Sequence, residues 1–229
     1  MQRYCYDLHT HTAPVSPCGR LSVRELIAQY RALRYDGIVL TDHFRTDFWN
    51  GEGDWNACAE RFLAPWREGC ALALEGFWVG RGMEIRFDDS PNDFLLYGWS
   101  TELFLAEGHN WLTMGLENFF AQYHEQMLII QAHPNRWDST HPADRRWLHG
   151  VEVYNTNPRH DSHNEVTMAW VKETTGLILT AGSDSHCTED VGRTGILTDR
   201  PLRSEAELAA LLCAGNYRLL MEGGSHALP

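Results

Sequence analysis

Asp-Leu-His-Thr-His-Thr at residues 7–12 follows the short apolar run Tyr-Cys-Tyr at residues 4–6. Side chains on an extended strand alternate between its two faces, so His9 and His11 point in the same direction. Two imidazoles at a strand end can hold one divalent metal ion through their ring nitrogens. The simpler alternative is that His9 and His11 are two ordinary polar residues at the end of a strand. A metal site therefore requires further metal-binding side chains elsewhere in the chain.

Metal-ligand residue types recur at four later points, at predicted strand ends or inside an apolar strand. They lie in Thr-Asp-His at residues 41–43, Gly-Met-Glu at 82–84, Ala-His-Pro at 132–134 and Gly-Ser-Asp-Ser-His at 182–186. The candidate ligands are His9, His11, His43, Glu84, His133, Asp184 and His186. By contrast, His124, His141, His149 and His226 are scattered, and we assign them to the surface or to helix caps.

The hydrophobic pattern predicts strands that alternate with helices. Beyond the N-terminal strand, strands are expected at residues 37–40, 79–87, 93–99, 127–132, 151–155, 177–181 and 216–221. Helices are expected at residues 22–34, 56–75, 101–126 with a break near 108–111, 169–175 and 204–212. Ser22 with Glu25, and Ser204 with Glu207, have the spacing of capping boxes. The aromatic, Gly-rich loop at residues 44–56 is either a substrate cover or an ordinary packed loop.

This order of elements predicts parallel βα units in an α/β fold. About seven or eight such units in one chain favour a closed or distorted barrel, in which catalytic groups gather at the C-terminal ends of the strands. We expect a single domain over residues 1–222, followed by a C-terminal tail, residues 223–229, that frays. The seven candidate ligands would then meet at one end of the barrel.

Composition narrows the classes of partner. The chain has 229 residues and a net charge of −12, from 19 Lys and Arg against 31 Asp and Glu. That charge disfavours long nucleic acid and anionic membrane as partners. The six cysteines are scattered, which favours reduced thiols and a cytoplasmic location. Neither a signal peptide nor a membrane-spanning run is expected, and no protein partner is evident.

Two acidic residues have distinct expected roles. Glu84 is a lone carboxylate in an apolar strand, which makes it either a satisfied buried acid or a ligand whose two oxygens bridge two cations. Only one of the neighbours Asp42 and His43 can face inward from an extended strand. We therefore assign His43 as a ligand and Asp42 as an outer partner that orients an imidazole.

The five motifs, in this order, resemble the PHP (polymerase and histidinol phosphatase) family over residues 7–186. The resemblance implies a distorted seven-stranded (β/α) barrel of the TIM-like kind. It also implies two or three divalent cations, Zn, Mn or Fe, at the C-terminal face and phosphoester hydrolysis as the activity. By motif, the first metal would take His9, His11, Glu84 and Asp184, the second Glu84 and His133, and the third His43 and His186.

Two positions of the resemblance are open. The missing ligand of the second metal is either His109 or Asp93, and we favour His109. Many relatives have a His or Asp a few residues after the opening pair, as a ligand of the third metal. Here the corresponding region contains Cys18, which could substitute but which we expect not to bind. The third site would then be weak, or filled by two histidines with phosphate and water.

The resulting hypothesis is hydrolysis of a small phosphate ester, such as a nucleotide, a sugar phosphate or a histidinol-phosphate-like compound. A metal-activated hydroxide at a bi- or trinuclear centre would attack phosphorus. His43 or His186 would protonate the leaving alkoxide. Arg136 and Arg159 are the best-placed arginines to clamp the substrate phosphate with paired hydrogen bonds.

Two other classes of function remain open. Amidohydrolase barrels also begin with His-x-His, and binuclear members commonly bridge their metals with a carbamylated lysine. The only lysine, Lys172, lies in a predicted helix, which excludes that form but not a mononuclear or Glu-bridged relative. The second alternative is a non-catalytic PHP module that binds metal or a partner, although such modules tend to lose ligands and this chain keeps at least seven candidates.

Overall fold

Strand β1 (Tyr4–Thr10) carries the first histidine and lies inside the sheet. It pairs in parallel with β2 (Gly37–Leu40) and antiparallel with β9 (Gly195–Thr198). Because neighbours cover both of its edges and the core covers its faces, every residue from Tyr6 to Thr12 is buried. The computed structural model describes residues 3–73, 76–221 and 224–227.

Seven strands form a nearly closed barrel in the order β1, β2, β4, β5, β6, β7, β8. The remaining bounds in this set are Trp78–Ile85 for β4, Phe94–Tyr97 for β5, Leu128–Gln131 for β6, Gly150–Asn155 for β7 and Ile178–Gly182 for β8. The end of β8 returns to β1 through a parallel bridge between Thr10 and Ser185. The predicted distorted (β/α) barrel of a single α/β domain is confirmed.

The barrel departs from a regular parallel (β/α) barrel mainly because one of its strands runs in the opposite direction. Strand β5 runs antiparallel to both β4 and β6, whereas the β1–β2, β2–β4, β6–β7 and β7–β8 pairs are parallel. Hydrophobic patterning does not encode strand direction, so the sequence alone could not show this reversal. Strand β3 (His43–Phe44) pairs with β4 and extends the line of β2 toward the barrel end.

An antiparallel extension adjoins β1. Strands β9, β10 (Tyr217–Met221) and β11 (Gly224–Ala227) pair successively beside it. Strand β9 was not predicted. The expectation that the whole tail frays is wrong for residues 224–227, because they pair with β10. The predicted helix end at residues 74–75, the domain boundary at 222–223 and the last two tail residues lie outside the described ranges.

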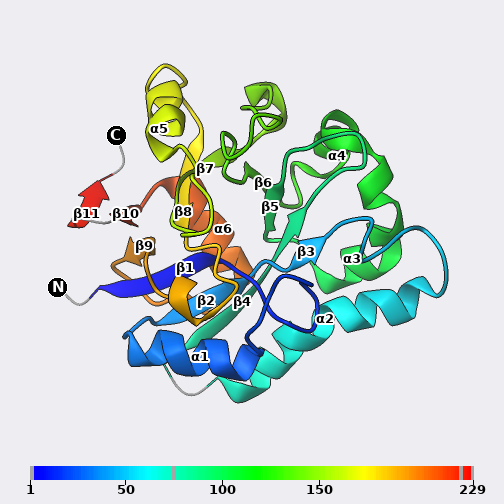
Figure 1. The fold of residues 1–229 in the computed structure, drawn as a ribbon, viewed down its shortest axis with the longest axis horizontal. Coiled ribbons are helices and arrows are strands. Elements are labelled where there is room, and N and C mark those ends of the chain that lie inside the picture. Colours follow the sequence, from blue (N-terminus) through cyan, green and yellow to red (C-terminus); the bar gives the residue numbers. More distant parts are fainter. Residues whose placement is uncertain (1–2, 74–75, 222–223, 228–229) are drawn as a thin grey trace.

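Helices cover the outside of the sheet (Figure 1). They are α1 (Val23–Ala32), α2 (Trp55–Leu72), α3 (Thr101–Glu107), α4 (Gly115–Tyr123), α5 (Asn164–Lys172) and α6 (Glu205–Ala214), with short 3₁₀ turns η1 (Gly108–Thr113), η2 (Arg145–Trp147) and η3 (Thr188–Asp190). The break predicted near residues 108–111 is η1. Across the described ranges, none of the helices combines the length and apolar character needed to cross a bilayer.

Capping residues fix several helix starts. Ser22 and Glu25 form the predicted capping box of α1. Ser204 caps α6 by accepting the Glu207 amide hydrogen, but the Glu207 carboxylate bonds to the backbone N–H of Arg203, so the second box is incomplete. Helix α5 starts at Asn164 and ends at Lys172, earlier than the predicted 169–175.

An aromatic core lies between the β4–β5 side of the barrel and helices α2 to α4. Phe104 is fully buried at its centre and contacts Phe44, Trp55 and Trp111 with ring centroids 5.1–5.5 Å apart. Trp49, from the loop predicted as a possible cover, is also buried and bonds through its indole to the His109 carbonyl. The loop at residues 44–56 is therefore anchored in the core by its aromatic residues.

Replacing Phe104 by Ala should lower the free energy of unfolding by about 3–5 kcal/mol, because the cavity would lie at the centre of this aromatic core. Urea denaturation followed by circular dichroism measures the change. The matched control is Val166→Ala on α5, where the side chain is exposed and the expected change is within about 0.5 kcal/mol. Equal effects of the two substitutions would contradict the assignment of this core.

Candidate metal centre

Seven predicted residues converge at the C-terminal end of the barrel. His9 lies in β1, His43 in β3 and Glu84 in β4, and the others follow β1, β6 and β8 directly. All are buried: His9, His11, His43, Glu84, His133, Asp184 and His186 are at most 7% exposed. Five separate stretches of chain thus supply one compact group of nitrogen and oxygen donors.

Glu84 is the centre of this group. Its Oε1 atom lies 2.9 Å from His133 Nε2 and 3.5 Å from His9 Nε2. Its Oε2 atom lies 2.7 Å from His43 Nδ1 and 3.5 Å from His11 Nε2. Each carboxylate oxygen therefore faces two imidazoles, which is the arrangement needed for a carboxylate that bridges two cations.

Asp184 lies on the other side of the opening histidine pair. Its Oδ1 atom is 3.1 Å from His11 Nε2 and 3.4 Å from His9 Nε2. Its Oδ2 atom is 2.7 Å from Nη1 of Arg136. The guanidinium thus occupies one oxygen and leaves the other directed at the histidine pair.

The far nitrogen of His9 is fixed by Glu152. Nδ1 of His9 lies 2.9 Å from Glu152 Oε1, and the carboxylate also accepts from the His133 amide and the Asn155 side chain. A β carbon at Gly182 would lie 2.3 Å from His9 Cβ and 2.7 Å from Glu152 Oε1, so glycine permits this close pairing. With Nδ1 turned to the carboxylate, His9 Nε2 points into the site, and its lone pair becomes available to a cation once its proton is lost.

A hydroxyl relay fixes His11. Its Nδ1 lies 3.2 Å from Ser16 Oγ, which donates to Asp42 Oδ1 at 2.7 Å and accepts the backbone N–H of His43 at 3.0 Å. Asp42 also accepts the amide and hydroxyl hydrogens of Thr12. Asp42 was predicted to orient an imidazole. In the structure it is connected to the His11 ring through the Ser16 hydroxyl rather than by a direct hydrogen bond.

Several donor atoms of this group have no hydrogen-bond partner in the described structure. They include His9 Nε2 and His11 Nε2. His43 Nδ1 and Glu84 Oε2 also lack a hydrogen bond but face each other at 2.7 Å, and Asp184 Oδ2 has only its ion pair with Arg136. Buried polar atoms are rarely left unpaired, because an unmade hydrogen bond in the interior is costly. Their position among imidazoles and carboxylates fits divalent cations of the Zn, Mn or Fe class.

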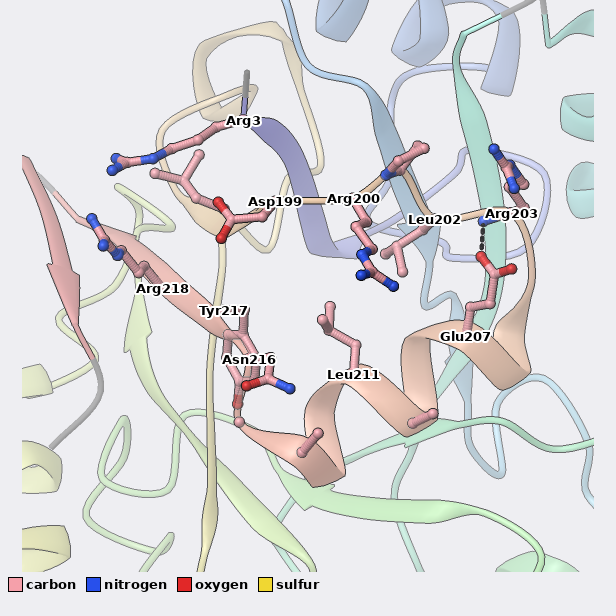
Figure 2. Close-up of a pocket in the computed structure, with 15 residues that line it drawn as sticks. Arg3, Asp199, Arg200, Leu202, Arg203, Glu207, Leu211, Asn216, Tyr217 and Arg218 are labelled. Atoms are coloured by element: carbon pink, nitrogen blue, oxygen red, sulfur yellow. Dashed lines mark hydrogen bonds between the residues drawn. The ribbon is translucent and has the colours of Figure 1, made fainter. Parts of the chain in front are cut away.

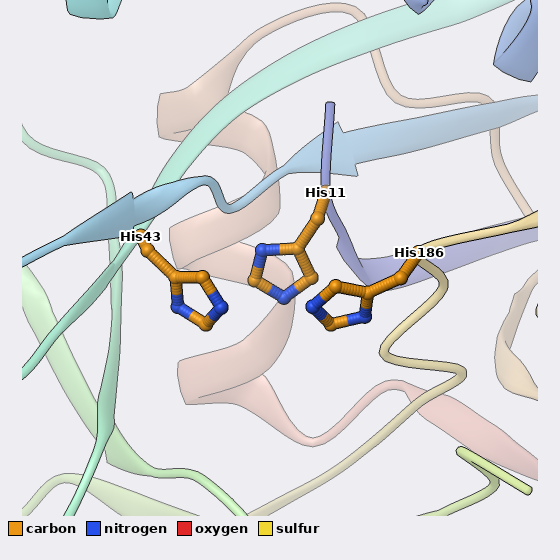
Figure 3. Close-up of side chains that lie close together, drawn as sticks. All are labelled: His11, His43 and His186. Carbon is orange, nitrogen blue, oxygen red and sulfur yellow. The ribbon is translucent and has the colours of Figure 1, made fainter. Parts of the chain in front are cut away.

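The potential ligands form four overlapping sets, and within each set the ligand atoms lie within 4.8 Å of one another. They are His9, His11 and Glu84; His9, His133 and Asp184; Glu84, Asp93 and His133; and His11, His43 and His186. The three imidazoles of the last set point toward one another from separate segments (Figure 3). The overlap through His9, His11 and Glu84 makes the group suitable for more than one ion.

The structure does not bring His109 into this centre. His109 is exposed in η1, and its Nε2 lies 2.8 Å from the side-chain amide of Asn110. The prediction that His109 is the missing ligand of the second metal is therefore not supported by the structure, because η1 turns the His109 side chain to the surface. The alternative, Asp93, lies in the set with Glu84, although Arg86 holds both of its oxygens at 2.8 and 2.6 Å.

Electrostatics keep three ligands in the form that binds cations. Burial would raise the pKa of Glu84, but His43 and His9 hold that pKa well below its usual value. Burial would likewise raise the pKa of Asp184, and His9 and Arg136 hold it well below the usual range. Burial, reinforced by two neighbouring imidazoles, lowers the pKa of His11 well below its ordinary value. Two carboxylates are thus ionised and His11 is neutral.

Two other imidazoles bind protons strongly without a cation. Burial would lower the pKa of His9, but nearby carboxylates, first that of Glu152, raise it well above the ordinary value. Burial is likewise outweighed at His43, where Glu84 is the main cause that raises the pKa to about 10. A proton on each imidazole offsets the negative charge that a metal ion would otherwise balance.

Two ligand candidates have backbone conformations in the left-handed region. The φ angle is 25° at His133 and 52° at Asp184. Non-glycine residues adopt such angles at a cost of about 1–3 kcal/mol, and they cluster at functional sites. The surrounding barrel therefore holds these two side chains where an unconstrained chain would not.

The two arginines predicted to bind substrate differ in setting. Arg136 is buried and is committed to Asp184, Asn155 and Ser162. Arg159 is exposed, and its Nη1 lies 2.9 Å from Oδ2 of Asp190, next to the segment that carries His186. The structure thus assigns Arg136 to orienting Asp184, and binding of a phosphate by either arginine stays a prediction.

A surface groove of about 880 Å³ lies elsewhere, between β9, α6 and β10. Its lining includes Arg3, Arg200 and Arg218 around Leu211 and Tyr217 (Figure 2). None of the metal-type residues described above lines this groove. The chemistry therefore has to be sought at the barrel end rather than in this groove.

Sequence reasoning missed Glu152 and Ser16. Glu152 is a lone carboxylate in the apolar strand Val-Glu-Val, the same signal that identified Glu84. It could have been found by applying that criterion to every strand. Ser16 has no comparable signal, because its role depends on a turn after β1 that returns its hydroxyl to Asp42.

Comparisons with known proteins find solved structures of similar fold and one family profile that matches part of the sequence. A family profile described as PHP-associated matches residues 162–217. No curated protein has a sequence that matches this chain. The crystal structure of PsfC from Pseudomonas syringae PB-5123 is similar, with a TM-score of 0.68 and 16% identity over 92% of this chain and 89% of PsfC.

Two further solved structures share the architecture. A candidate metal-dependent phosphoesterase from Bifidobacterium adolescentis has a TM-score of 0.55 and 15% identity, covering 92% of this chain and 96% of its own. An amidohydrolase from Chromobacterium violaceum, with bound sulfate and no metal, has a TM-score of 0.56 and 17% identity, covering 94% of this chain and 97% of its own. At these identities the likeness shows the fold alone.

Replacing Glu152 by Gln should weaken metal binding about 10- to 100-fold, because His9 would lose the carboxylate that fixes its ring and raises its basicity. Isothermal titration with Zn²⁺ or Mn²⁺ measures the affinity. Glu68→Gln on the exposed face of α2 is the matched control and should bind like the wild type. Unchanged affinity in the Glu152 variant would show that the pair does not support a metal ligand.

Metal binding should release protons, and affinity should rise with pH. The pKa of His43 is raised to about 10 and that of His9 well above its ordinary value, so both imidazoles hold their protons more strongly than a free imidazole does in the metal-free protein, and ligation removes those protons. Titration in two buffers with different ionisation enthalpies measures the number released. His43→Asn should reduce that number, whereas the exposed His124→Asn should not; a pH-independent affinity would contradict the proposed ligand set.

Proposed function

We propose that the chain is a PHP-domain protein and that it acts as a metal-dependent phosphoesterase on a small phosphate ester. The observation that carries the proposal is the set of buried, unpartnered donor atoms around Glu84. A single carboxylate with two imidazoles at each oxygen provides shared ligands for neighbouring cations. Paired cations held in this way are typical of enzymes that transfer phosphoryl groups.

The proposed cofactors are two to three divalent cations, Zn, Mn or Fe. His9, His11, Glu84 and Asp184 would hold one cation, and Glu84, His133 and Asp93 a second. His43 and His186 would contribute to a third. Bound cations would supply Lewis-acid activation of water and neutralise charge on the phosphoryl oxygens.

The chain's own residues would orient these ligands and handle protons. Arg136 holds one oxygen of Asp184 and so directs the other toward the histidine pair. His43 and His186 are the most exposed imidazoles of the centre, at 7% and 6%. Their place at its edge suits them to pass a proton to a leaving alkoxide, and the raised pKa of both imidazoles, to which nearby carboxylates contribute, favours the protonated form.

The proposed substrate is a small phosphorylated molecule rather than a polymer. The net charge of −12 gives no electrostatic support for long nucleic acid. Nucleotides, sugar phosphates and histidinol-phosphate-like compounds each present one phosphate that the cations could hold. We propose a cytoplasmic protein that acts without a membrane, and no described feature calls for a protein partner.

A second candidate activity is amide hydrolysis, favoured by the similarity in fold to the Chromobacterium violaceum amidohydrolase. The binuclear form bridged by a carbamylated lysine is excluded, because Lys172 is exposed at the end of α5. A Glu-bridged amidohydrolase would use the same ligands. Substrate tests, rather than ligand geometry, therefore distinguish the two activities.

Metal-loaded protein should release inorganic phosphate from at least some members of a panel of nucleotides, sugar phosphates and histidinol phosphate, and Glu84→Gln should abolish this. The loss should exceed about 100-fold, because Glu84 contacts more of the centre than any outer partner does. Phosphate release and bound metal per chain are measured together. Exposed Glu117→Gln serves as the control.

Three outcomes decide between the activities. Phosphate release that depends on metal and on Glu84 supports the phosphoesterase. Hydrolysis of cyclic amides without phosphate release would replace it with the amidohydrolase. Full metal occupancy without either activity would indicate a non-catalytic metal-binding module.

A further inference from the structure

The barrel closes between β1 and the end of β8 through a seam with little strand pairing. In the described part of the chain, one isolated bridge joins Thr10 to Ser185. The amide of His11 donates to the Ser185 carbonyl at 3.0 Å, and the amide of Ser185 donates to the His9 carbonyl at 3.4 Å. The candidate ligands His9 and Asp184 lie on opposite sides of this seam, so its width sets their separation.

The carboxylate of Asp7 joins the two sides of the seam. Its Oδ1 atom accepts the backbone N–H of His9 on β1 and the backbone N–H of Ser183 after β8, each at 3.1 Å. Its Oδ2 atom accepts the phenolic hydrogen of Tyr30 at 2.7 Å. Asp7 is fully buried, and it belongs to none of the ligand groups found among the described residues. A carboxylate removed from water needs such hydrogen bonds, so Asp7 is held to both backbones.

Tyr30 brings helix α1 to the same point. Its side chain is fully buried, and its hydroxyl lies 2.9 Å from Ser183 Oγ and 3.1 Å from Ser185 Oγ. These two serines flank Asp184, whose φ angle of 52° is in the left-handed region. Such a conformation persists only where the surroundings over-determine it. One phenol therefore contacts both neighbours of a strained ligand and the carboxylate that holds the opposite strand.

We propose that Asp7 and Tyr30 are positioning residues that set the separation of His9 and Asp184, and thereby the affinity for the cation these two ligands share. This inference rests on the proposed function for the presence of that cation. Neither Asp7 nor Tyr30 contacts the cation in this proposal, because both act through the backbone of the segments that carry the ligands.

The observed spacing shows why a small change in the seam would matter. Two ligand atoms of one tetrahedral ion, each about 2.0–2.2 Å from it, lie about 3.3–3.6 Å apart. Nε2 of His9 and Oδ1 of Asp184 are 3.4 Å apart in the structure. The two sides of the barrel therefore already stand at the separation that a shared ion requires, and the seam cluster Asp7, Tyr30, Ser183 and Ser185 holds them there.

Replacing Tyr30 by Phe removes the hydroxyl and keeps the buried ring. Isothermal titration with Zn²⁺ should show an affinity about 10-fold lower for the tightest ion, because the backbone on both sides of Asp184 loses its anchor. The matched control is Tyr35→Phe. Tyr35 is also buried and packs on Tyr30 with ring centroids 5.1 Å apart, but its hydroxyl donates to the Thr194 carbonyl, away from the seam. That variant should bind Zn²⁺ like the wild type.

A second variant tests whether the two residues act as one unit. Asp7→Asn keeps the size of the side chain and one oxygen acceptor but removes the charge that accepts from Tyr30, so it should also weaken Zn²⁺ binding. The double variant Asp7→Asn/Tyr30→Phe should lose little more affinity than the weaker-binding single variant, because residues in one hydrogen-bonded cluster are not additive. Fully multiplied losses would contradict a common mechanism.

The outcomes separate this inference from the proposed function. Wild-type Zn²⁺ affinity in Tyr30→Phe would overturn the positioning role and leave the phosphoesterase proposal intact. Equal losses of affinity in Tyr30→Phe and Tyr35→Phe would also overturn it, because they would trace the effect to general loss of stability. Melting temperatures of the metal-free variants, which should fall by similar amounts, supply that comparison. Absence of stoichiometric Zn²⁺ binding by the wild type would overturn both proposals.

Discussion

The contact of Glu84 with four imidazoles is the interaction on which the rest of the centre depends. A carboxylate that is 1% exposed is tolerable only if charge or hydrogen bonds compensate its loss of water. Without a cation, protons on His9 and His43 provide that compensation, as the raised pKa of each shows. A bound cation would replace those protons, and the interior would then stay balanced in both states.

An outer layer of side chains fixes the geometry of these donor groups. Glu152 fixes the ring of His9, and Asp42 fixes that of His11 through Ser16. Arg136 similarly holds one oxygen of Asp184. These residues come from strands or turns beside those that carry the ligands, so the closure of the barrel sets the positions of both layers. The residues of both layers lie in strands or shortly after strand ends, where the barrel limits their movement, and this favours stable preorganisation.

Much of the fold and the inner layer could be predicted, because both follow short-range rules. Alternation along a strand placed His9, and strand ends marked His133 and Asp184. What the rules missed depends on distant contacts: the reversed direction of β5, the additional strand β9 and the pairing of residues 224–227. His109 was misassigned because spacing along the chain does not tell which way a short 3₁₀ helix turns its side chains. The structure shows that these residues converge, and metal binding by them is the proposal made above.

The left-handed backbone at His133 and Asp184 implies that activity and robustness oppose each other in this protein. Selection in the laboratory for heat resistance alone would favour glycine or asparagine at these two positions, since such residues relax the local conformation. The molecule would gain durability while losing two of its candidate metal ligands. Stabilised descendants of this sequence should therefore be sought among substitutions in the outer helices, away from the open end of the barrel.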